Sequence, residues 1–267
     1  STNRKTFLLL DGFAGLKAMV YDLERTGLGH VDLYVGIDLG GPGERIVSGK
    51  VSGMPDASGG SLYCAIALNP RPRRAVSSAS IPDDSFGRGD APMTKAEVRS
   101  VSVSKLGLSR DSVVYDIGAG TGSVTVEMAM AALSGKVFAF EKNEESVKLI
   151  KANAERFSLS NVEAVPGLAP ESFAGLPTPT HAFIGGSSGN MGKILDSLLG
   201  MDPGMPIVVT AITLETMAET LDYVKSKGLE HEVSHISVAR ARKVGDYSLM
   251  TCANPVYVIS VNSKVPE

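Results

Sequence analysis

The sequence predicts an α/β protein with a mostly parallel sheet that carries helices on both faces, together with a small α/β piece at its amino terminus. From residue 94 onward, short apolar segments of strand length alternate with longer segments of helical period, a pattern typical of parallel sheets. Residues 71–83 are rich in Pro, Ser and charge, which predicts a linker. We therefore expect a first block over residues 1–70 and a main domain over residues 84–267.

The first block has few predicted elements. The patterns favour a strand over Thr6–Leu10, a helix over Gly15–Arg25, and strands over Val31–Ile37 and Leu62–Leu68. No evident core follows from so few elements, so this block is expected to be part of a domain.

The main domain begins with a predicted helix over Thr94–Leu106. Thr94 and Glu97 have the spacing of a capping box, in which both side chains bind backbone N–H groups at the start of a helix. The predicted strands and helices then alternate: Val113–Ile117, Ser123–Leu133 (helix), Val137–Phe140, Glu144–Phe157 (helix), Val162–Val165, Ala182–Ile184, Met191–Leu199 (helix), Ile207–Ala211, Leu214–Lys227 (helix), Glu232–Val238 and Val256–Val261. Sheets of this kind bind ligands at the carboxyl ends of their strands.

Composition excludes several classes of protein. No apolar run approaches the roughly 18 residues that a membrane span needs, and the amino terminus does not read as a signal peptide. The two cysteines lie in no Cys-x-x-Cys pattern, so neither a disulfide framework nor a metal site is expected. Residues 75–267 carry 17 Lys and Arg against 22 Asp and Glu, a poor match to nucleic acid. We expect a cytoplasmic protein with no nucleic-acid or membrane partner.

The strongest local signal is the glycine loop Asp116-Ile117-Gly118-Ala119-Gly120-Thr121-Gly122, which follows a predicted strand and opens a helix. Such a loop lets a ligand approach backbone N–H groups closely. Its glycine spacing is tighter than that of the dinucleotide fingerprint, and a second acid, Glu141, ends the next strand. This combination resembles the class I S-adenosylmethionine methyltransferases, a Rossmann-like fold. A dinucleotide site and a plain glycine turn are the alternatives.

Five ordered motifs carry a closer resemblance. They are Pro92–Arg99, the glycine loop, Phe183–Gly186, Thr210–Thr216 and Asn254–Pro255. Together they are similar to the decarboxylating precorrin methyltransferases of cobalamin biosynthesis, over residues 84–267. The resemblance implies S-adenosylmethionine as methyl donor, a tetrapyrrole (precorrin) substrate, methylation of carbon 15 and removal of the carboxyl of an acetate side chain. It also implies a homo-oligomer, typically a tetramer.

The first block resembles a different enzyme. Leu8–Asp11, Gly40–Ile46 and Tyr63–Ala67 are similar to the carboxyl-terminal half of the carbon-5 precorrin methylase, which is often fused ahead of the carbon-15 enzyme. The chain is accordingly expected to be a fragment of such a fusion, without carbon-5 activity.

The resemblance also implies roles for residues of the cofactor site. Thr94 and the loop residues Gly118, Ala119, Gly120, Thr121 and Gly122 would contact the methionine part, with Asp116 near it. Glu141 would hold the ribose, and Ala169 would lie against the adenine. Leu168 stands where the family loop commonly has Asp, so no side-chain contact to the adenine amino group is expected there. Methyl transfer from a sulfonium needs no protein nucleophile, and no catalytic residue is assigned.

Three segments are candidates for binding the substrate's carboxylates. Gly186, Ser187 and Ser188 run into a helix, whose amino terminus favours anions. Arg240 and Arg242 share one face if their segment is extended, and Thr213 and Glu215 lie just beyond the strand Ile207–Ala211. A capped loop, a solvated face and a helix-start acid are the respective alternatives. For the whole protein, the alternatives are an RNA methyltransferase with the same cofactor fold and a cofactor-binding subunit without turnover.

Overall fold

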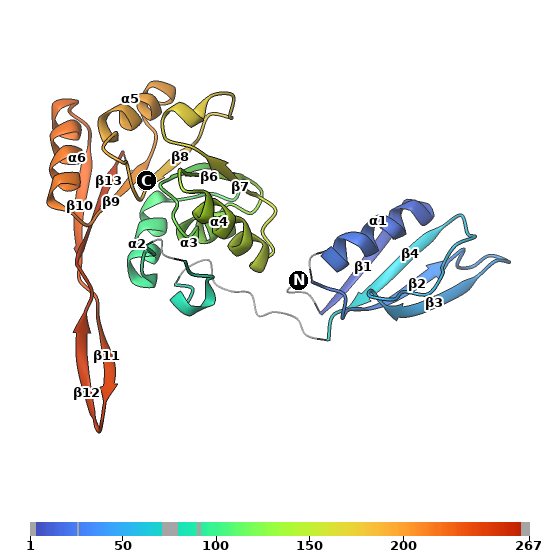
Figure 1. The fold of residues 1–267 in the computed structure, drawn as a ribbon. Coiled ribbons are helices and arrows are strands. Elements are labelled where there is room, and N and C mark those ends of the chain that lie inside the picture. Colours follow the sequence, from blue (N-terminus) through green and yellow to red (C-terminus); the bar gives the residue numbers. More distant parts are fainter. Residues whose placement is uncertain (1–3, 26, 71–79, 90–91, 263–267) are drawn as a thin grey trace. The chain divides into compact units, whose positions relative to one another are not determined.

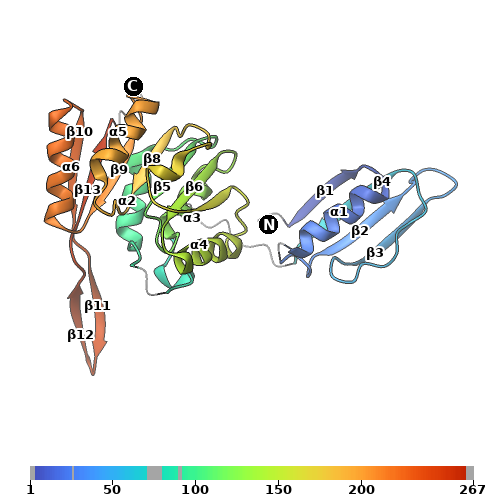
Figure 2. The same ribbon diagram turned by 45° about the horizontal axis from the view of Figure 1, so that its top comes forward.

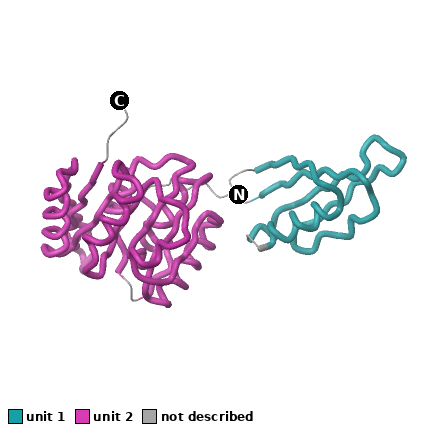
Figure 3. The backbone as a smooth tube through the Cα atoms, turned by 90° about the horizontal axis from the view of Figure 1, so that it is seen from above, with its two compact units in different colours: residues 1–76 teal, residues 77–267 magenta. Residues whose placement is uncertain are grey.

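The computed structural model describes residues 4–25, 27–70, 80–89 and 92–262. The chain divides into two compact units, residues 1–76 and residues 77–267, which are coloured separately in Figure 3. No helix in the described part of the chain is long and apolar enough to cross a membrane.

Unit 1 is an antiparallel sheet with one helix. Its elements are β1 (Lys5–Leu10), α1 (Gly12–Arg25), β2 (Asp32–Ile37), β3 (Arg45–Lys50) and β4 (Tyr63–Leu68), and the strand order is β1-β4-β2-β3. The sequence did not predict β3. Leu16 of α1 packs on Leu33, Val35 and Ile37 of β2, all of them buried. Unit 1 therefore has a core of its own, and the expectation that it lacks one is wrong, because buried residues of β2 and β4 form one apolar cluster with α1.

Unit 2 is built on a seven-stranded sheet in the order β10-β13-β9-β8-β5-β6-β7 (Figure 1). Five neighbouring strands are parallel, and β13 is antiparallel to both β9 and β10. The strands are β5 (Val113–Ile117), β6 (Lys136–Glu141), β7 (Val162–Pro166), β8 (His181–Ile184), β9 (Ile207–Ala211), β10 (His231–Ile236) and β13 (Val256–Val261).

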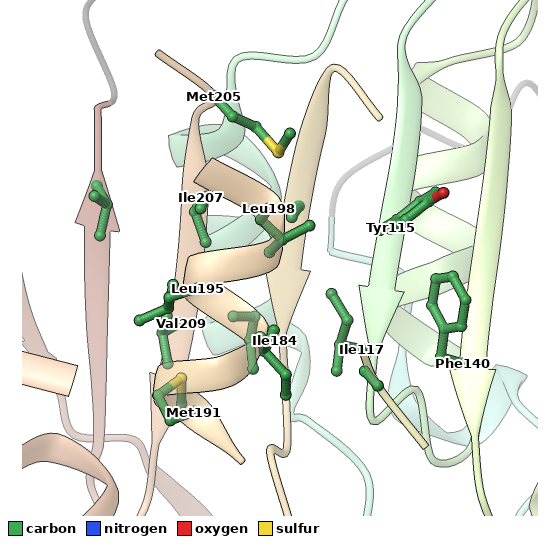
Figure 4. Packing of buried hydrophobic residues seen from close by; sticks show 14 of the residues in the cluster. Tyr115, Ile117, Phe140, Ile184, Met191, Leu195, Leu198, Met205, Ile207 and Val209 are labelled. Atoms are coloured by element: carbon green, nitrogen blue, oxygen red, sulfur yellow. The ribbon is translucent and has the colours of Figure 1, made fainter. Parts of the chain in front are cut away.

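Helices cover both faces of this sheet. One layer contains α2 (Ala96–Leu106), α3 (Ser123–Ala131) and α4 (Glu144–Arg156), and the other contains α5 (Met191–Met201) and α6 (Leu214–Ser226). Figure 4 shows the second interface, where Leu195 and Leu198 of α5 meet Ile184 and Val209 of the sheet. Because both faces are covered, the central strands are mostly apolar on both sides, with Asp116 in β5 and Thr210 in β9 as buried polar residues.

The strand order places a ligand site. From β5 the chain proceeds outward to β6 and β7, and then returns to the other side of β5 for β8 and β9. The connections after β5 and β8 therefore leave the sheet in opposite directions. Ligands of such sheets bind in the crevice at this switch point, outside the carboxyl ends of the strands.

Unit 2 differs from the sequence prediction in two further respects, its starting point and an additional hairpin. Ile81 and Asp83, within the expected linker, are buried, so the connecting segment ends before them; residues 71–79 of that segment lie outside the described residues. The second difference is a hairpin of β11 (Ala239–Val244) and β12 (Tyr247–Cys252), which projects from the sheet between β10 and β13 (Figures 1 and 2). The sequence did not predict these strands, because a hairpin exposed on both faces has no buried side to create an alternating pattern.

Candidate functional site

A cavity of about 760 Å³ lies at the carboxyl ends of β5, β6, β8 and β9. The predicted site residues that line it are Thr94, Gly118, Ala119, Gly120, Thr121, Glu141, Ala169, Gly186, Ser187 and Ser188. They come from segments that are far apart in the sequence, so the fold assembles most of the expected cofactor site and the loop after β8 in one place. Asp116, Gly122, Thr213 and Glu215 were also expected at the site but do not line the cavity.

The glycine loop has the backbone that its residues permit. Gly118, Gly120 and Gly122 have φ values of +71°, +55° and +75°, in the left-handed region that side chains with a Cβ rarely adopt. A Cβ on Gly118 would lie 2.5 Å from the Gly186 carbonyl oxygen, and one on Gly122 would lie 3.1 Å from the Ile150 Cα of α4. Gly118 therefore allows two loops to touch at the cavity floor, and Gly122 packs the loop on α4 instead of facing the cavity.

Glu141 ends β6 and faces the cavity. Its Oε2 accepts a hydrogen bond from the Gly120 N–H at 2.9 Å, and its Oε1 accepts one from the Asn143 N–H at 3.0 Å. A carboxylate has about four acceptor positions, so both oxygens keep capacity for the hydroxyls of a ligand. Glu141 thus fixes the glycine loop and offers acceptors to the cavity at once.

Asp116 lies beneath the loop, not in it. Its side chain is fully buried, Oδ2 accepts a hydrogen bond from the Thr125 hydroxyl, and Oδ1 has no partner among the described residues. Burial raises the pKa of this carboxyl to about 7, with the nearby Glu141 charge adding to the effect. The expected contact of Asp116 with the cofactor therefore needs correction, because the side chain turns into the protein toward α3.

The start of α2 also differs from the predicted capping box. The helix begins at Ala96 with Lys95 as N-cap, and neither Thr94 nor Glu97 caps it through a side chain. Instead, Asp83 Oδ1 accepts the Ala96 N–H at 3.0 Å, from a segment that the sequence placed in the linker. Thr94 is thereby left at the cavity wall, where its carbonyl accepts a hydrogen bond from Arg99 at 2.6 Å.

Arg99 supports this wall from the protein interior, through its hydrogen bond to the Thr94 carbonyl. Its side chain is fully buried, and it contacts Glu127 of α3 at 2.8 Å and Asp83 at 3.3 Å. A buried guanidinium needs such partners because an unpaired charge is costly to bury. Sequence analysis did not identify this cluster, since its members are separated by many residues and no short motif joins them.

Lys142 is a second residue that sequence analysis missed. It directly follows Glu141, it lines the cavity, and its Nζ donates to the Ser188 hydroxyl at 3.0 Å. The contact joins the loop after β6 to the loop after β8. A lysine immediately after the acid that ends β6 was the available signal. It places a cation beside Ser187 and Ser188, which the sequence had singled out for binding anions.

The two arginines expected at the substrate site have different surroundings. Arg240 lies at the base of the hairpin, where its guanidinium contacts Glu97 Oε2 at 2.6 Å and Asp83 Oδ2 at 3.1 Å. This pairing lowers the pKa of Glu97, chiefly through the Arg240 hydrogen bond. Arg240 therefore joins the hairpin to α2, and its expected pairing with substrate carboxylates needs correction. Arg242, farther along β11, lines a smaller hollow of about 270 Å³.

Thr213 and Glu215 are at the start of α6. The Thr213 hydroxyl accepts the Thr216 N–H at 3.2 Å, so it caps the helix, and Glu215 lies in the first helical turn. Thr210, in the preceding strand β9, lines the cavity instead. No group of three or more His, Cys, Asp and Glu side chains arranged for a metal ion occurs within the residues that the structure describes.

Comparison with known proteins is consistent with this site. A family described as the precorrin methyltransferase domain matches residues 84–263. A protein of Pyrobaculum calidifontis named "Probable cobalt-precorrin-6B C(15)-methyltransferase (decarboxylating)" is 43% identical over 184 residues, which are 67% of this chain and 94% of that protein. The cobalt-precorrin-6B C(15)-methyltransferase (decarboxylating) of Salmonella typhimurium is 34% identical over 67% of this chain and 93% of its own length.

A solved structure extends the similarity to the fold. The precorrin-6y C5,15-methyltransferase of Geobacter metallireducens aligns with a TM-score of 0.65 and 36% identity, covering 69% of this chain and 98% of that one. The fold of unit 2 is thus that of a class I methyltransferase.

Proposed function

The chain belongs to the precorrin methyltransferase domain family, and on this premise we propose that it methylates carbon 15 of cobalt-precorrin-6B and removes a carboxyl group from the same substrate. The methyl donor is S-adenosylmethionine. The observation that carries the proposal is that the glycine loop and Glu141 face one 760 Å³ cavity, within the region that matches the family.

The residues of this cavity fit the donor. The glycine loop presents its backbone to the cavity, Glu141 offers two carboxylate oxygens for ribose hydroxyls, and Leu168 and Ala169 supply apolar surface for an adenine. When bound, S-adenosylmethionine supplies an electrophilic methyl group on a sulfonium. The protein's part is to orient the donor and the acceptor carbon and to keep water out, which by itself accounts for large accelerations.

Charge balance explains why the two reactions belong together. Carbon 15 provides the electron pair for the new C–C bond, and the pair of the broken C–S bond stays on sulfur. Loss of the acetate carboxylate as carbon dioxide returns an electron pair to the macrocycle and cancels the positive charge that arrived with the methyl group. No acidic or nucleophilic side chain is required for either bond change.

Lys142, Ser187 and Ser188 are suited to bind one substrate carboxylate. The ammonium group of Lys142 and the hydroxyl of Ser188 are already 3.0 Å apart, and charge-assisted hydrogen bonds are the stronger kind. All three residues line the cavity. A corrin precursor carries carboxylates around its rim, so this cluster would fix the orientation of the ring relative to the methyl donor.

The test is mass spectrometry of cobalt-precorrin-6B after incubation with the chain and S-adenosylmethionine. The expected product has gained one methyl group and lost one carbon dioxide. An unchanged tetrapyrrole, together with measurable binding of S-adenosylmethionine, would contradict the proposed substrate; methylation of added RNA would then point to the alternative acceptor.

Two further parts of the proposal concern unit 1 and assembly. We propose that unit 1 corresponds to part of a carbon-5 precorrin methylase, without carbon-5 activity. The motifs Leu8–Asp11, Gly40–Ile46 and Tyr63–Ala67 support it. Carbon-5 methylation detected with the purified chain would contradict the loss of this activity. We also propose a homo-oligomer, in the first instance a tetramer. The exposed apolar side chains of Tyr247 and Met250 on the hairpin support it, and light scattering in solution measures it.

A further inference from the structure

The cavity adjoins a second hollow at the base of the β11–β12 hairpin. This hollow has a volume of about 270 Å³, and Lys95, Val238 and Ala253 line it and the main cavity alike. Lys95 is the neighbour of Thr94, which also lines the main cavity. The shared residues place the two hollows side by side on the protein surface.

The two hollows differ in their acidic residues. The main cavity is lined by two carboxylates, Glu141 and Glu145, and by two lysines, Lys95 and Lys142. The hollow under the hairpin is lined by Lys95, Arg240 and Arg242, with no Asp or Glu among the described residues that line it. Carboxylates near the donor favour its hydroxyls and cationic groups, whereas cations under the hairpin favour an anion.

The three cations that line the hairpin hollow differ in whether they have carboxylate partners. Arg240 is held by Glu97 and Asp83, so its charge is largely satisfied inside the protein. Neither Lys95 nor Arg242 forms an ion pair with a carboxylate in the described part of the chain. Arg240 fixes the base of the hairpin, and the positive charge left for a ligand is that of Lys95 and Arg242.

We propose that the hollow under the hairpin, with Lys95 and Arg242, is a binding site for carboxylates of the tetrapyrrole substrate, so that the ring extends from the methyl donor toward β11. This inference rests on the proposed function and adds to it the position of the substrate. The apolar residues Val238 and Ala253, at the junction of the two hollows, give surface for the ring itself.

The hairpin offers a matched control in the adjacent residue. Side chains alternate along a strand, so Arg242 shares a face with Arg240, whereas Lys243 lies on the other face and lines neither hollow. Arg242→Gln and Lys243→Gln remove the same charge from neighbouring exposed positions. Arg242→Lys keeps the charge but loses the two-pronged geometry of the guanidinium.

The experiment measures equilibrium binding of cobalt-precorrin-6B to the full chain saturated with S-adenosylhomocysteine, so that no turnover occurs, and in parallel the affinity for S-adenosylmethionine. We expect Arg242→Gln and Lys95→Gln each to weaken substrate binding about tenfold, as for loss of one charge-assisted hydrogen bond. Arg242→Lys should fall between Arg242→Gln and the unsubstituted chain. Lys243→Gln should change the dissociation constant less than about twofold, and binding of S-adenosylmethionine should be unchanged in the variants at Arg242 and Lys243, which do not line the donor cavity.

Different results have different meanings. Equal substrate affinities for Arg242→Gln and Lys243→Gln, in a chain that does bind the substrate, would overturn the inference and leave the proposed function intact. A chain that binds S-adenosylmethionine but not cobalt-precorrin-6B would overturn the proposed function and the inference together. Thermal unfolding of each variant identifies any loss of affinity that comes from unfolding.

Discussion

Gly118→Ala tests the contact on which the cavity floor depends. Gly118 has φ of +71°, and an added Cβ would lie 2.5 Å from the carbonyl oxygen and 2.8 Å from the nitrogen of Gly186. Those atoms belong to backbone, which is held in place because the Gly186 N–H donates to the Ile117 carbonyl at 3.3 Å. The loop after β8 therefore has to move when the methyl group is added.

The expected magnitude has two parts. The left-handed conformation costs a residue with a Cβ about 1–2 kcal/mol, and forcing an extra methyl group into a packed site costs about 1–3 kcal/mol more. Gly107→Ala is the matched control, since Gly107 has φ of +64° and an added Cβ there would meet nothing within 4 Å. We expect about 1–2 kcal/mol of destabilisation for Gly107→Ala and about 2–5 kcal/mol for Gly118→Ala.

Scanning calorimetry measures the difference in stability between Gly107→Ala and Gly118→Ala. The transition of unit 2 is identified as the one that S-adenosylmethionine shifts upward, and about 2–4 °C of its midpoint corresponds to 1 kcal/mol in a domain of this size. Gly118→Ala should also weaken S-adenosylmethionine binding at least about tenfold, because Gly118 and Gly186 both line the cavity and the displaced loop changes its shape. Equal midpoints and equal affinities for the two variants would refute the close approach of Gly118 and Gly186.

Three further predictions follow from the charged groups of unit 2. Because burial raises the Asp116 pKa to about 7, the folded state binds more protons than the unfolded state between about pH 4 and pH 7, so stability should fall as pH rises through that window; Asp116→Asn should flatten the profile. Glu141→Gln should weaken S-adenosylmethionine binding by about tenfold, since a neutral amide accepts hydroxyl hydrogen bonds less strongly. Arg240→Gln should lower stability by about 1–2 kcal/mol, because it removes the ion-pair partner of Oδ2 in the nearly buried carboxylate of Asp83, and should speed hydrogen exchange in the hairpin.

Each of these predictions has its own measurement. Thermal unfolding at a series of pH values, with and without Asp116→Asn, tests the predicted pH dependence of stability. An unchanged profile in the variant would show that the buried Asp116 carboxyl does not control the pH response. Titration calorimetry measures the affinity of Glu141→Gln for S-adenosylmethionine, with Glu145→Gln as the control at a neighbouring acid that lines the cavity. Hydrogen exchange of the hairpin amides tests Arg240→Gln, with Lys243→Gln as the control. Equal exchange rates in the two variants would contradict the role of Arg240 in holding the hairpin.

Local patterns predicted most of the regular elements of unit 2. The strands that end in Ile117 and Glu141 are short and buried on both faces, so apart from Asp116 their central residues are apolar, and glycine or charge bounds them. The loop Gly118–Gly122 was recognisable because positive φ values restrict the choice of residue at fixed spacing. These signals lie within a few neighbouring residues, and a sequence displays them directly.

Capping of α2 shows where the local signal misleads. Thr94 and Glu97 have capping-box spacing, yet the first free N–H of the helix is bound by Asp83, and Glu97 pairs instead with Arg240. Thr94 lines the cavity and does not cap the helix. Spacing alone does not decide between a cap from the same turn and one from a segment that folds back onto the helix.

The sequence by itself determined the parallel sheet, the glycine loop, the acid that ends β6 and the family to which the chain belongs. Only the tertiary structure decided which charges are available to a ligand. Arg240 and Glu97 are 143 residues apart, and Lys142 and Ser188 are 46 apart. Such pairs form because the order of strands in the sheet brings their loops together. A charged side chain looks the same in the sequence whether it meets a partner or not, so its role is fixed only when the fold has supplied or withheld that partner.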